Sequence, residues 1–362
     1  METADILIIG GGIAGVSAAA AVAPHARVLL LEAEPALACH ASGRSAALYE
    51  PRYGNPAVVA LSLASGDALR AIPGVLSPRG ILLVADEDSA ETGRTEANAM
   101  QLAPVTADAA LAILPILNPA TLAFAAHATH AWDIDTDLLI QTLARQARAA
   151  GARIVTGTPV TGIVRQGAGW RVVWAGGSAT AGVIVNAAGA WADRVAVMAG
   201  VAPLGLRPLR RSMARIPAPA GYDVSRWPMT LAAGESWYMK PDAGALIVSP
   251  AEEDAVAEPH DAFADDMVLA EGLARYEAAV TAPVTRMLAN WAGLRTFAPD
   301  RVPSIGFAPD SPGFFWLAGQ GGYGFQTAPA AAALAADLLT GRAAGLPADL
   351  VAALTPGRFG PG

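Results

Sequence analysis

Glycines near the N-terminus are the first residues whose spacing indicates chemistry. Gly10, Gly12 and Gly15 have the GxGxxG spacing within the run GGGIAG. The first glycine allows a tight turn, the second lets the backbone approach a pyrophosphate, and the third lets a helix pack close to a strand. Glu32, at the end of the next apolar run, would accept hydrogen bonds from a ribose hydroxyl. The pattern therefore predicts a dinucleotide site and leaves open whether FAD or NAD binds there.

A second glycine-rich run lies near the C-terminus, in FFWLAGQGGYGFQT. We expect a strand that ends at Ala318, then a glycine loop, then an alanine-rich helix that starts near Gln326. Ligands of open α/β sheets bind at the carboxyl ends of the strands, and glycines allow a backbone to lie against a flat ring. The positive end of the helix dipole would stabilise an anionic reduced flavin. An ordinary strand–helix turn is the alternative interpretation.

The elements that must position these glycines are predicted from hydrophobic periodicity. Two apolar runs on either side of an alanine-rich stretch form a strand–turn–helix–strand unit around the first glycines. Residues 133–152 have helical spacing, an acidic start and a terminal glycine, so we expect a capped amphipathic helix. Asp133, Asp135 and Asp137 are accordingly interpreted as helix-capping residues instead of metal ligands. We then expect a small hairpin layer and a return strand into a parallel sheet, from the runs 153–155, 161–165, 170–174 and 182–189.

Composition bounds the class of protein. The chain has 362 residues, which is long enough for a large core and two domains. Its net charge of −8 and the lack of a basic cluster argue against a nucleic-acid-binding protein. The single cysteine, Cys39, excludes a disulfide framework and a thiolate metal cage, and it fits a cytoplasmic protein. Lys240 is the only lysine, so a pyridoxal-phosphate enzyme would depend on that residue alone.

The sequence predicts neither a membrane span nor a signal peptide. The N-terminal apolar run has Asp5 at its head, no preceding basic residue, and glycines that interrupt it. No stretch reaches about 18 uninterrupted apolar residues. Mixed composition and many prolines indicate that a second domain is inserted into the first. We expect the first domain to comprise residues 1–72, 133–203 and 301–362 and the second to comprise residues 73–132 and 204–300.

Several longer motifs carry a family resemblance that spans nearly the whole chain. They are HASGRSAALYEPRYG (40–54), VIVNAAGAWAD (183–193), PLGLRPLRRS (203–212), WPM (227–229), GESWYMKPDAG (234–244) and WAGLRTF (291–297). With the two glycine-rich runs, they make the chain similar to the FAD-dependent D-amino acid oxidase superfamily, and within it most similar to the bacterial D-arginine dehydrogenases. The resemblance implies an α/β fold, in which a Rossmann-like FAD-binding domain carries an inserted α+β substrate domain built on a mixed sheet over the flavin.

The resemblance also assigns roles to residues at matching positions. Arg211 and Arg295 match the two arginines that hold the substrate α-carboxylate, and a guanidinium fork suits a carboxylate. The other residues that it places at the substrate are Tyr53 and Tyr238 in the pocket lining, Gly322 and Gln326 near the amine and flavin, and Met229 in an apolar wall. The residues that it places at the FAD are Gly10, Gly12, Ile13, Ala14, Gly15, Glu32, Ser42, Arg44, Ser45, Ala46, Ala188, Gly189, Trp191, Gly319, Gly321, Gly322, Tyr323, Gly324 and Phe325.

The chain departs from the D-arginine dehydrogenase pattern at two pocket positions. Leu48 stands where that family has a histidine, and Ile81 stands where it has a glutamate that grips the guanidinium. Because burying an unpaired charge costs several kcal/mol, we expect a lost preference for D-Arg and D-Lys and a shift to apolar D-amino acids. Glu50, in the same loop as Leu48, could restore a preference for basic substrates.

The mechanism that the resemblance implies is hydride transfer from the substrate Cα to flavin N5. The resulting imino acid hydrolyses to a 2-oxo acid and ammonia, and electrons pass to a quinone-like or other acceptor. The amine must be neutral to expel the hydride, and the sequence offers no strong general base. We interpret the histidines outside the flavin motifs as surface or core residues: His25, His127, His130 and His260.

Three points stay open in the sequence. Some relatives attach FAD covalently to a histidine near His40, although the D-arginine dehydrogenases hold FAD non-covalently and non-covalent FAD is the favoured expectation. The same arginine pair would serve glycine, sarcosine, another secondary amine or a 2-hydroxy acid. A flavin-binding protein without turnover is the alternative from another functional class.

Overall fold

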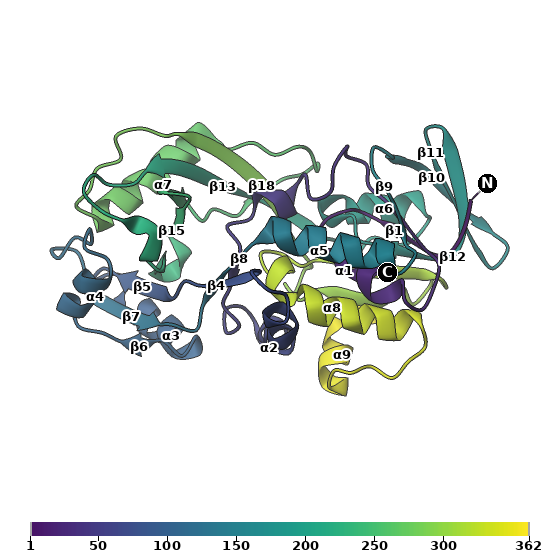
Figure 1. The fold of residues 1–362 in the computed structure, drawn as a ribbon, viewed down its shortest axis with the longest axis horizontal. Coiled ribbons are helices and arrows are strands. Elements are labelled where there is room, and N and C mark those ends of the chain that lie inside the picture. Colours follow the sequence, from purple (N-terminus) through teal and green to yellow (C-terminus); the bar gives the residue numbers. More distant parts are fainter. Residues whose placement is uncertain (1, 361–362) are drawn as a thin grey trace.

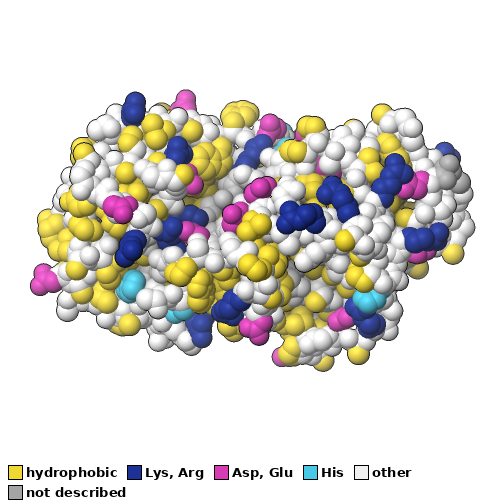
Figure 2. All heavy atoms as spheres, in the orientation of Figure 1, with side chains coloured by type: hydrophobic (Ala, Val, Ile, Leu, Met, Phe, Trp, Pro, Cys, Tyr) yellow, Lys and Arg dark blue, Asp and Glu magenta, His cyan; other side chains and the backbone are white. Residues whose placement is uncertain are grey.

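Two large β-sheets and the helices packed on them form the elongated molecule in Figure 1. The computed structural model describes residues 2–360, and the expected domain limits at residues 1 and 362 lie outside that range. No helix within residues 2–360 is long and apolar enough to cross a membrane. Acidic and basic side chains are interspersed on the face that Figure 2 shows.

The first sheet is largely parallel and contains the predicted N-terminal unit. Its central strands are apolar and buried, as expected for a parallel sheet that is covered on both faces. Its order is β10 (Val160–Gln166), β11 (Gly169–Trp174), β12 (Gly177–Asn186), β1 (Glu2–Ile9), β2 (Val28–Leu31) and β9 (Arg153–Val155). Strand β20 (Phe314–Ala318) pairs in parallel with residues 184–186 of β12, on the edge that β11 occupies nearer the start of β12. Strand β19 (Ser304–Phe307) pairs antiparallel to β20.

The predicted hairpin layer and return strand are confirmed for the runs 161–165, 170–174 and 182–189. The run 153–155 does not belong to that layer, because it forms β9, which pairs in parallel with β2 at the opposite edge of the sheet. Strands β10, β11 and β12 pair antiparallel in sequence order, and β12 then runs parallel to β1 with Ile9 opposite Asn186. The return strand therefore ends at Asn186, three residues before the predicted limit at Gly189, because Gly189 begins a short 3-10 turn, η2 (Gly189–Trp191).

Small side chains let helices pack closely on the first sheet. The alanine-rich helix α1 (Ile13–Val22) is buried almost throughout and contacts two other helices, which is typical of a helix in a core. The other helices on the side of the first sheet are α2 (Pro56–Arg70), α5 (Thr136–Ala149), α6 (Ala192–Met198), α8 (Gly324–Leu339) and α9 (Ala348–Leu354).

The second sheet is mixed, as the family resemblance implied. Its order is β17 (Asp254–Ala255), β13 (Arg207–Pro217), β16 (Ala245–Ser249), β15 (Tyr238–Asp242), β14 (Met229–Ala232), β5 (Ile81–Ala85), β7 (Phe124–Ala128) and β6 (Ala103–Pro104). Strand β18 (Ala289–Phe297) also pairs with β13, and β14 runs parallel to β5. Its helices are α3 (Ala90–Ala99), α4 (Ala107–Ile113) and α7 (Asp266–Ala279). Together the sheets confirm the predicted α/β fold with a second, mixed sheet.

A small third sheet joins segments that are distant in sequence. Its strands are β3 (Leu48–Tyr49), β8 (Trp132–Ile134) and β4 (Leu76–Pro78). The prediction of a helix over 133–152 was wrong at its start, because residues 132–134 pair in this sheet and α5 begins at Thr136. Asp135 caps the helix by accepting a hydrogen bond from the Leu138 N–H at 2.9 Å, whereas Asp133 forms ion pairs described below.

Candidate active site

A cavity of about 540 Å³ opens at the carboxyl ends of β1 and β2. The α1 N-terminus, the segment around η1 (Ala41–Arg44), η2 and the glycine loop before α8 also line it. This is the position at which open α/β sheets bind nucleotides. Most of the residues that the family resemblance assigned to FAD line this cavity.

Two of the motif glycines have no room for a side chain. A Cβ at Gly10, where φ is +115°, would lie 2.3 Å from the Ala187 carbonyl oxygen. A Cβ at Gly15 would lie 1.9 Å from the Gly10 carbonyl oxygen, so only glycine lets α1 approach β1 this closely. Gly15 therefore acts behind the cavity wall, and it is not among the lining residues.

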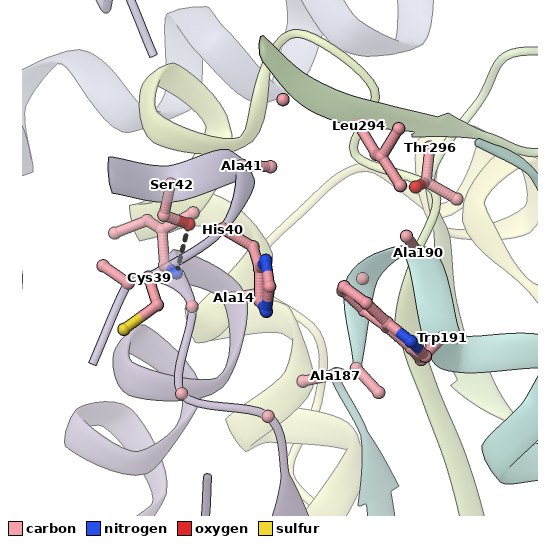
Figure 3. A pocket seen from close by; sticks show the side chains of 18 of the residues that line it. Ala14, Cys39, His40, Ala41, Ser42, Ala187, Ala190, Trp191, Leu294 and Thr296 are labelled. Carbon is pink, nitrogen blue, oxygen red and sulfur yellow. Dashed lines mark hydrogen bonds between the residues drawn. The ribbon is translucent and has the colours of Figure 1, made fainter. Parts of the chain in front are cut away.

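The start of α1 presents unpaired N–H groups to the cavity. The Ile13 N–H donates to Ser42 Oγ at 3.0 Å, the hydrogen bond drawn in Figure 3. Among the residues described, no acceptor is recorded for the N–H groups of Gly12, Ala14 and Gly15. Free N–H groups at the positive end of a helix dipole form an anion site, so the residues present fit a pyrophosphate.

Glu32 has a second role that its spacing did not predict. Its carboxylate accepts hydrogen bonds from the Gly11 N–H and, at 2.8 Å, from the Glu34 N–H. These bonds brace the glycine turn against the end of β2. Glu32 also lines the cavity, and its contact with a ribose stays a prediction.

His40 and Trp191 form an aromatic part of the cavity wall (Figure 3). Their ring centroids lie 4.6 Å apart, and His40 Nε2 lies 2.9 Å from Glu34 Oε1. His260, which was predicted to be a surface or core residue, is exposed and also lines this cavity. It belongs to the loop between β17 and α7, so its position depends on the second sheet and has no signal in the flavin motifs.

Four predicted FAD residues do not line this cavity: Gly15 and Gly319 line no cavity, and Ala46 and Tyr323 line a smaller one beside it. Gly319, with φ +78°, packs beside Ala298 and is not a lining residue of either cavity. Ala46 and Tyr323 line only the smaller cavity described next. Tyr323 packs against Tyr53 there, with ring centroids 5.5 Å apart.

A smaller cavity of about 70 Å³ adjoins the first. The two cavities share five lining residues, Ser45, Arg211, Arg295, Gly322 and Phe325. Every residue that sequence comparison placed at the substrate lines the smaller cavity: Leu48, Glu50, Tyr53, Ile81, Arg211, Met229, Tyr238, Arg295, Gly322 and Gln326. Strands of the second sheet, the segment 45–53 and the glycine loop with the start of α8 therefore meet at this cavity.

Strand register brings the two arginines together. Leu209 lies opposite Arg295 and Arg211 lies opposite Gly293 in the antiparallel pair β13–β18. Residues two apart on a strand share a face, so Arg211 and Arg295 are diagonal neighbours on the same face. Arg211 is only 3% exposed, and its Nε has no hydrogen-bond partner among the residues described.

Three acidic or basic residues near the arginine pair were missed by sequence analysis. Arg301 donates to both carboxylate oxygens of Glu253, at 2.8 and 2.9 Å, and Arg211 Nη2 donates to Glu253 Oε1 at 3.2 Å. Glu235 lies 4.0 Å from Arg211 and accepts a hydrogen bond from the Tyr53 hydroxyl at 2.7 Å. Glu252, whose Oε1 accepts from the Ser212 N–H at 2.7 Å, is a further acidic group close to Arg211. Burial and the charge of Glu235 raise the pKa of Tyr53, which keeps its hydroxyl protonated.

Glu50 is the most deeply buried acidic group of this site. It is 2% exposed, and burial raises its pKa to about 7. Its Oε1 accepts a hydrogen bond from the Arg52 N–H at 3.0 Å, and its Oε2 lies 3.3 Å from His130 Nε2. His130, expected to be an uninvolved surface or core residue, therefore packs directly against a residue of the small cavity. Burial also lowers the pKa of His130, so this imidazole is mostly neutral near pH 7, where Glu50 is only partly ionised.

The fold, the glycine turn and the free N–H groups define a protein that binds a dinucleotide beside a small cavity lined by two arginines. Residues 5–338 match the family model described as "FAD dependent oxidoreductase", so the chain belongs to that family and FAD is its cofactor. This identifies FAD as the dinucleotide that the sequence left open.

Known proteins of several activities are similar to this chain. A tRNA 5-methylaminomethyl-2-thiouridine biosynthesis bifunctional protein of Ralstonia nicotianae is 29% identical over 257 residues, which cover 63% of this chain and 38% of that protein. Glycine oxidase of Pseudomonas putida is 26% identical over 353 residues, covering 93% and 94%. The crystal structure of glycine oxidase from Geobacillus kaustophilus superposes with a TM-score of 0.82 at 23% identity, over 97% of this chain and 98% of that one. The chain thus spans about two-fifths of the first relative's length.

Proposed function

We propose that the protein oxidises small α-amino acids at the Cα–N bond, with apolar D-amino acids as the preferred substrates. The observation that carries the proposal is the small cavity against the FAD site, with Arg211 and Arg295 on one face of β13–β18. The unpaired Arg211 Nε beside a second guanidinium suits a carboxylate. The product would be an imino acid, which water converts to a 2-oxo acid and ammonia.

Binding by the arginine pair would fix the orientation of the substrate. Two guanidinium forks can hold both carboxylate oxygens, and Tyr53 and Tyr238 belong to the same lining. Bound FAD supplies the two-electron acceptor, and the chain supplies position and electrostatics. Gln326 is held in place there, because its Oε1 accepts a hydrogen bond from the Glu50 N–H at 3.2 Å.

The cavity wall supports apolar and small side chains. Leu48, Ile81, Met229 and Leu231 form its hydrocarbon part. The cavity volume of about 70 Å³ suits a small side chain. A guanidinium would find no carboxylate at Ile81. The Oε1 of Glu50 already accepts from the Arg52 N–H, its Oε2 has no hydrogen-bond partner among the residues described, and its raised pKa of about 7 leaves it only partly ionised near neutral pH. These features argue against D-Arg as the preferred substrate.

Glycine or a secondary amine such as sarcosine is the second candidate. The small cavity volume and the similarity to glycine oxidases both favour it. The same arginine pair would hold these substrates, and the electron acceptor we propose for either is quinone-like. Non-covalent FAD is favoured by His40, whose Nε2 is already directed to Glu34. Acid precipitation should therefore release free FAD into the supernatant.

Anaerobic flavin bleaching tests the proposal. The holoprotein would be mixed with D-Ala, D-Leu, D-Met, D-Phe and D-Arg, their L-enantiomers, glycine, sarcosine and 2-hydroxy acids. We expect the fastest bleaching with an apolar D-amino acid. Faster bleaching with D-Arg than with any apolar D-amino acid would overturn the proposed preference. Bleaching by glycine or sarcosine alone would select the second candidate, and no bleaching at all would favour a flavin-binding protein without turnover.

A variant can test the pocket directly. Ile81→Glu should restore the missing acidic partner and raise the D-Arg to D-Leu ratio of bleaching rates by at least about tenfold, because a paired buried charge is worth more than about 1.4 kcal/mol. Ile81→Gln is the matched control, since it adds polarity without charge. An equal change in both variants would show that charge is not the selecting feature.

A further inference from the structure

The only lysine of the chain is buried beside the small cavity. Lys240 lies on β15 and is 9% exposed. Its ammonium donates to the Ala46 carbonyl oxygen at 2.5 Å and lies 3.4 Å from the Ala47 carbonyl oxygen. Lys240 lines neither cavity, so it cannot touch the cofactor or the substrate in this arrangement.

The lysine is fixed by a buried ion-pair cluster. Its Nζ lies 2.9 Å from Asp133 Oδ1, and Arg79 Nε donates to Asp133 Oδ2 at 2.7 Å. Arg79 Nη1 also donates to the Ser225 and Trp227 carbonyl oxygens, at 2.8 and 2.9 Å. All three charged side chains are less than a fifth exposed. Burial of such a cluster is costly, so its retention calls for a role in positioning.

The segment that Lys240 holds lies between the two cavities. Ser45 lines both cavities, and Ala46 and Ala47 line the smaller one. Ala47 has φ +42°, in the left-handed region that an alanine rarely adopts without support. The Ala47 N–H donates to Ser45 Oγ at 3.1 Å, and this N–H belongs to the same peptide unit as the Ala46 carbonyl that Lys240 binds.

Two donors of this segment are left free. Within residues 2–360, no acceptor is recorded for the Ser45 hydroxyl or for the Ala46 N–H. Because Ser45 Oγ already accepts from Ala47, its hydroxyl hydrogen is directed elsewhere. An ammonium on a peptide carbonyl also polarises that peptide and strengthens the hydrogen bond that its N–H donates.

We infer that Lys240, held by Asp133 and Arg79, is a positioning residue that keeps the Ser45 hydroxyl and the Ala46 N–H available as donors at the boundary between cofactor and substrate. The acceptor is an oxygen or nitrogen atom of the bound flavin or the carboxylate of the substrate. The carboxylate case rests on the proposed function, because it requires the small cavity to be the substrate site.

A double-mutant cycle on the FAD-loaded protein tests the inference. The variants are Lys240→Met, Ser45→Ala and the double variant. The measurements are the visible spectrum of bound FAD, the Tm, and the Kd of propanoate, which serves as a carboxylate probe without an amine. A flavin acceptor should give the same spectral change in all three variants. A carboxylate acceptor should raise the Kd of propanoate about fivefold in each, with no further change in the double variant.

Two further variants keep the test decisive. Arg215→Met is the control, because it breaks the half-exposed Arg215–Asp242 pair at 2.8 Å on the same sheet and away from both cavities. It should leave the spectrum and the propanoate Kd unchanged. Should Lys240→Met fail to hold FAD, Asp133→Asn takes its place, since it keeps the lysine and removes its partner.

A fall in Tm without any change in spectrum or Kd would overturn the inference and leave Lys240 a structural residue. Additive changes in the double variant would also overturn it, because they would show that Lys240 does not act through Ser45. Neither measurement needs turnover. Failure of every amino acid to bleach the flavin would therefore contradict the proposed function and not this inference.

Discussion

Arg211 is the residue on which the proposed substrate site most depends. It is nearly inaccessible, and its charge is shared with Glu253, which Arg301 also holds. Glu253 therefore fixes the guanidinium and leaves it with spare donors, including the unpaired Nε. An arginine arranged in this way is preorganised for an additional anion.

Arg211→Met should raise KM for the fastest amino acid by about 10- to 100-fold, because a charge-assisted hydrogen bond is worth roughly 1.5–3 kcal/mol. Steady-state kinetics would measure the change. Arg210→Met is a matched control on the neighbouring position of β13, where the side chain pairs with Asp254 at 2.8 Å on the other face. A similar KM in the Arg211 variant and the wild type would remove this residue from the substrate site.

Glu50 makes a prediction about pH. Its folded-state pKa of about 7 lies above its ordinary value of 4.5, so its neutral form favours the folded state. The contribution is fully present below about pH 4.5 and is lost as pH rises to about 7. Glu50→Gln should therefore gain stability over the wild type between pH 5 and pH 8, by up to roughly 3 kcal/mol. Denaturant unfolding at both pH values would measure it, and an equal difference at the two values would contradict it.

At the scale of elements, the close packing of α1 on β1 depends on one glycine. Gly15→Ala would place a Cβ 1.9 Å from the Gly10 carbonyl oxygen and push the helix N-terminus away from the pyrophosphate site. We expect at least a tenfold weaker FAD affinity, measured by flavin fluorescence. Gly162→Ala is the control, since a Cβ there meets nothing closer than 3.9 Å on β10. Equal FAD affinity in both variants would contradict the packing argument.

Elements with a strong local pattern could be predicted from the sequence. The N-terminal unit, the β10–β12 hairpin layer and the β20–α8 loop follow from apolar runs and glycines, although α8 begins at Gly324 instead of near Gln326. The residues of the small cavity came from family motifs. By contrast, the start of α5 was misplaced because residues 132–134 pair with β3 and β4, and Asp133 is held by Lys240 and Arg79, all of which are distant in sequence.

The remaining site features depend on tertiary contacts that no local spacing encodes. Glu253 and Arg301 reach Arg211 only when the loops after β16 and β18 meet. The burial of Glu50 beside His130 requires the β3 loop to pack near the turn before β8. For the same reason, His260 could not be recognised as a residue of the FAD cavity.

At the scale of the whole molecule, a loop that belongs to the second sheet closes the FAD cavity, which the first sheet and its helices mainly form. The loop between β17 and α7 supplies Asp261, which pairs with Arg44, and the Ala262 carbonyl oxygen, which accepts from Arg44 at 2.7 Å. Glu258 of the same loop pairs with Arg194. FAD binding and the packing of the second sheet's loop on the first sheet's helices should therefore stabilise each other.

Arg44→Met should speed FAD dissociation about tenfold, because it removes the Asp261 ion pair and two hydrogen bonds to carbonyl oxygens. Release could be followed by the rise in flavin fluorescence after dilution. Arg27→Met removes an exposed pair with Asp5 and serves as the control. Unchanged release in the Arg44 variant would show that the loop does not retain the cofactor.

The position of Trp191 has an optical consequence. The chain has eight tryptophans, and Trp191 lies in the wall of the FAD cavity (Figure 3). An indole in the wall of this cavity would transfer part of its excitation to the flavin of bound FAD instead of emitting light. Part of the protein's intrinsic ultraviolet emission should therefore disappear when FAD binds and return when FAD leaves, so the molecule carries its own unlabelled reporter of cofactor occupancy.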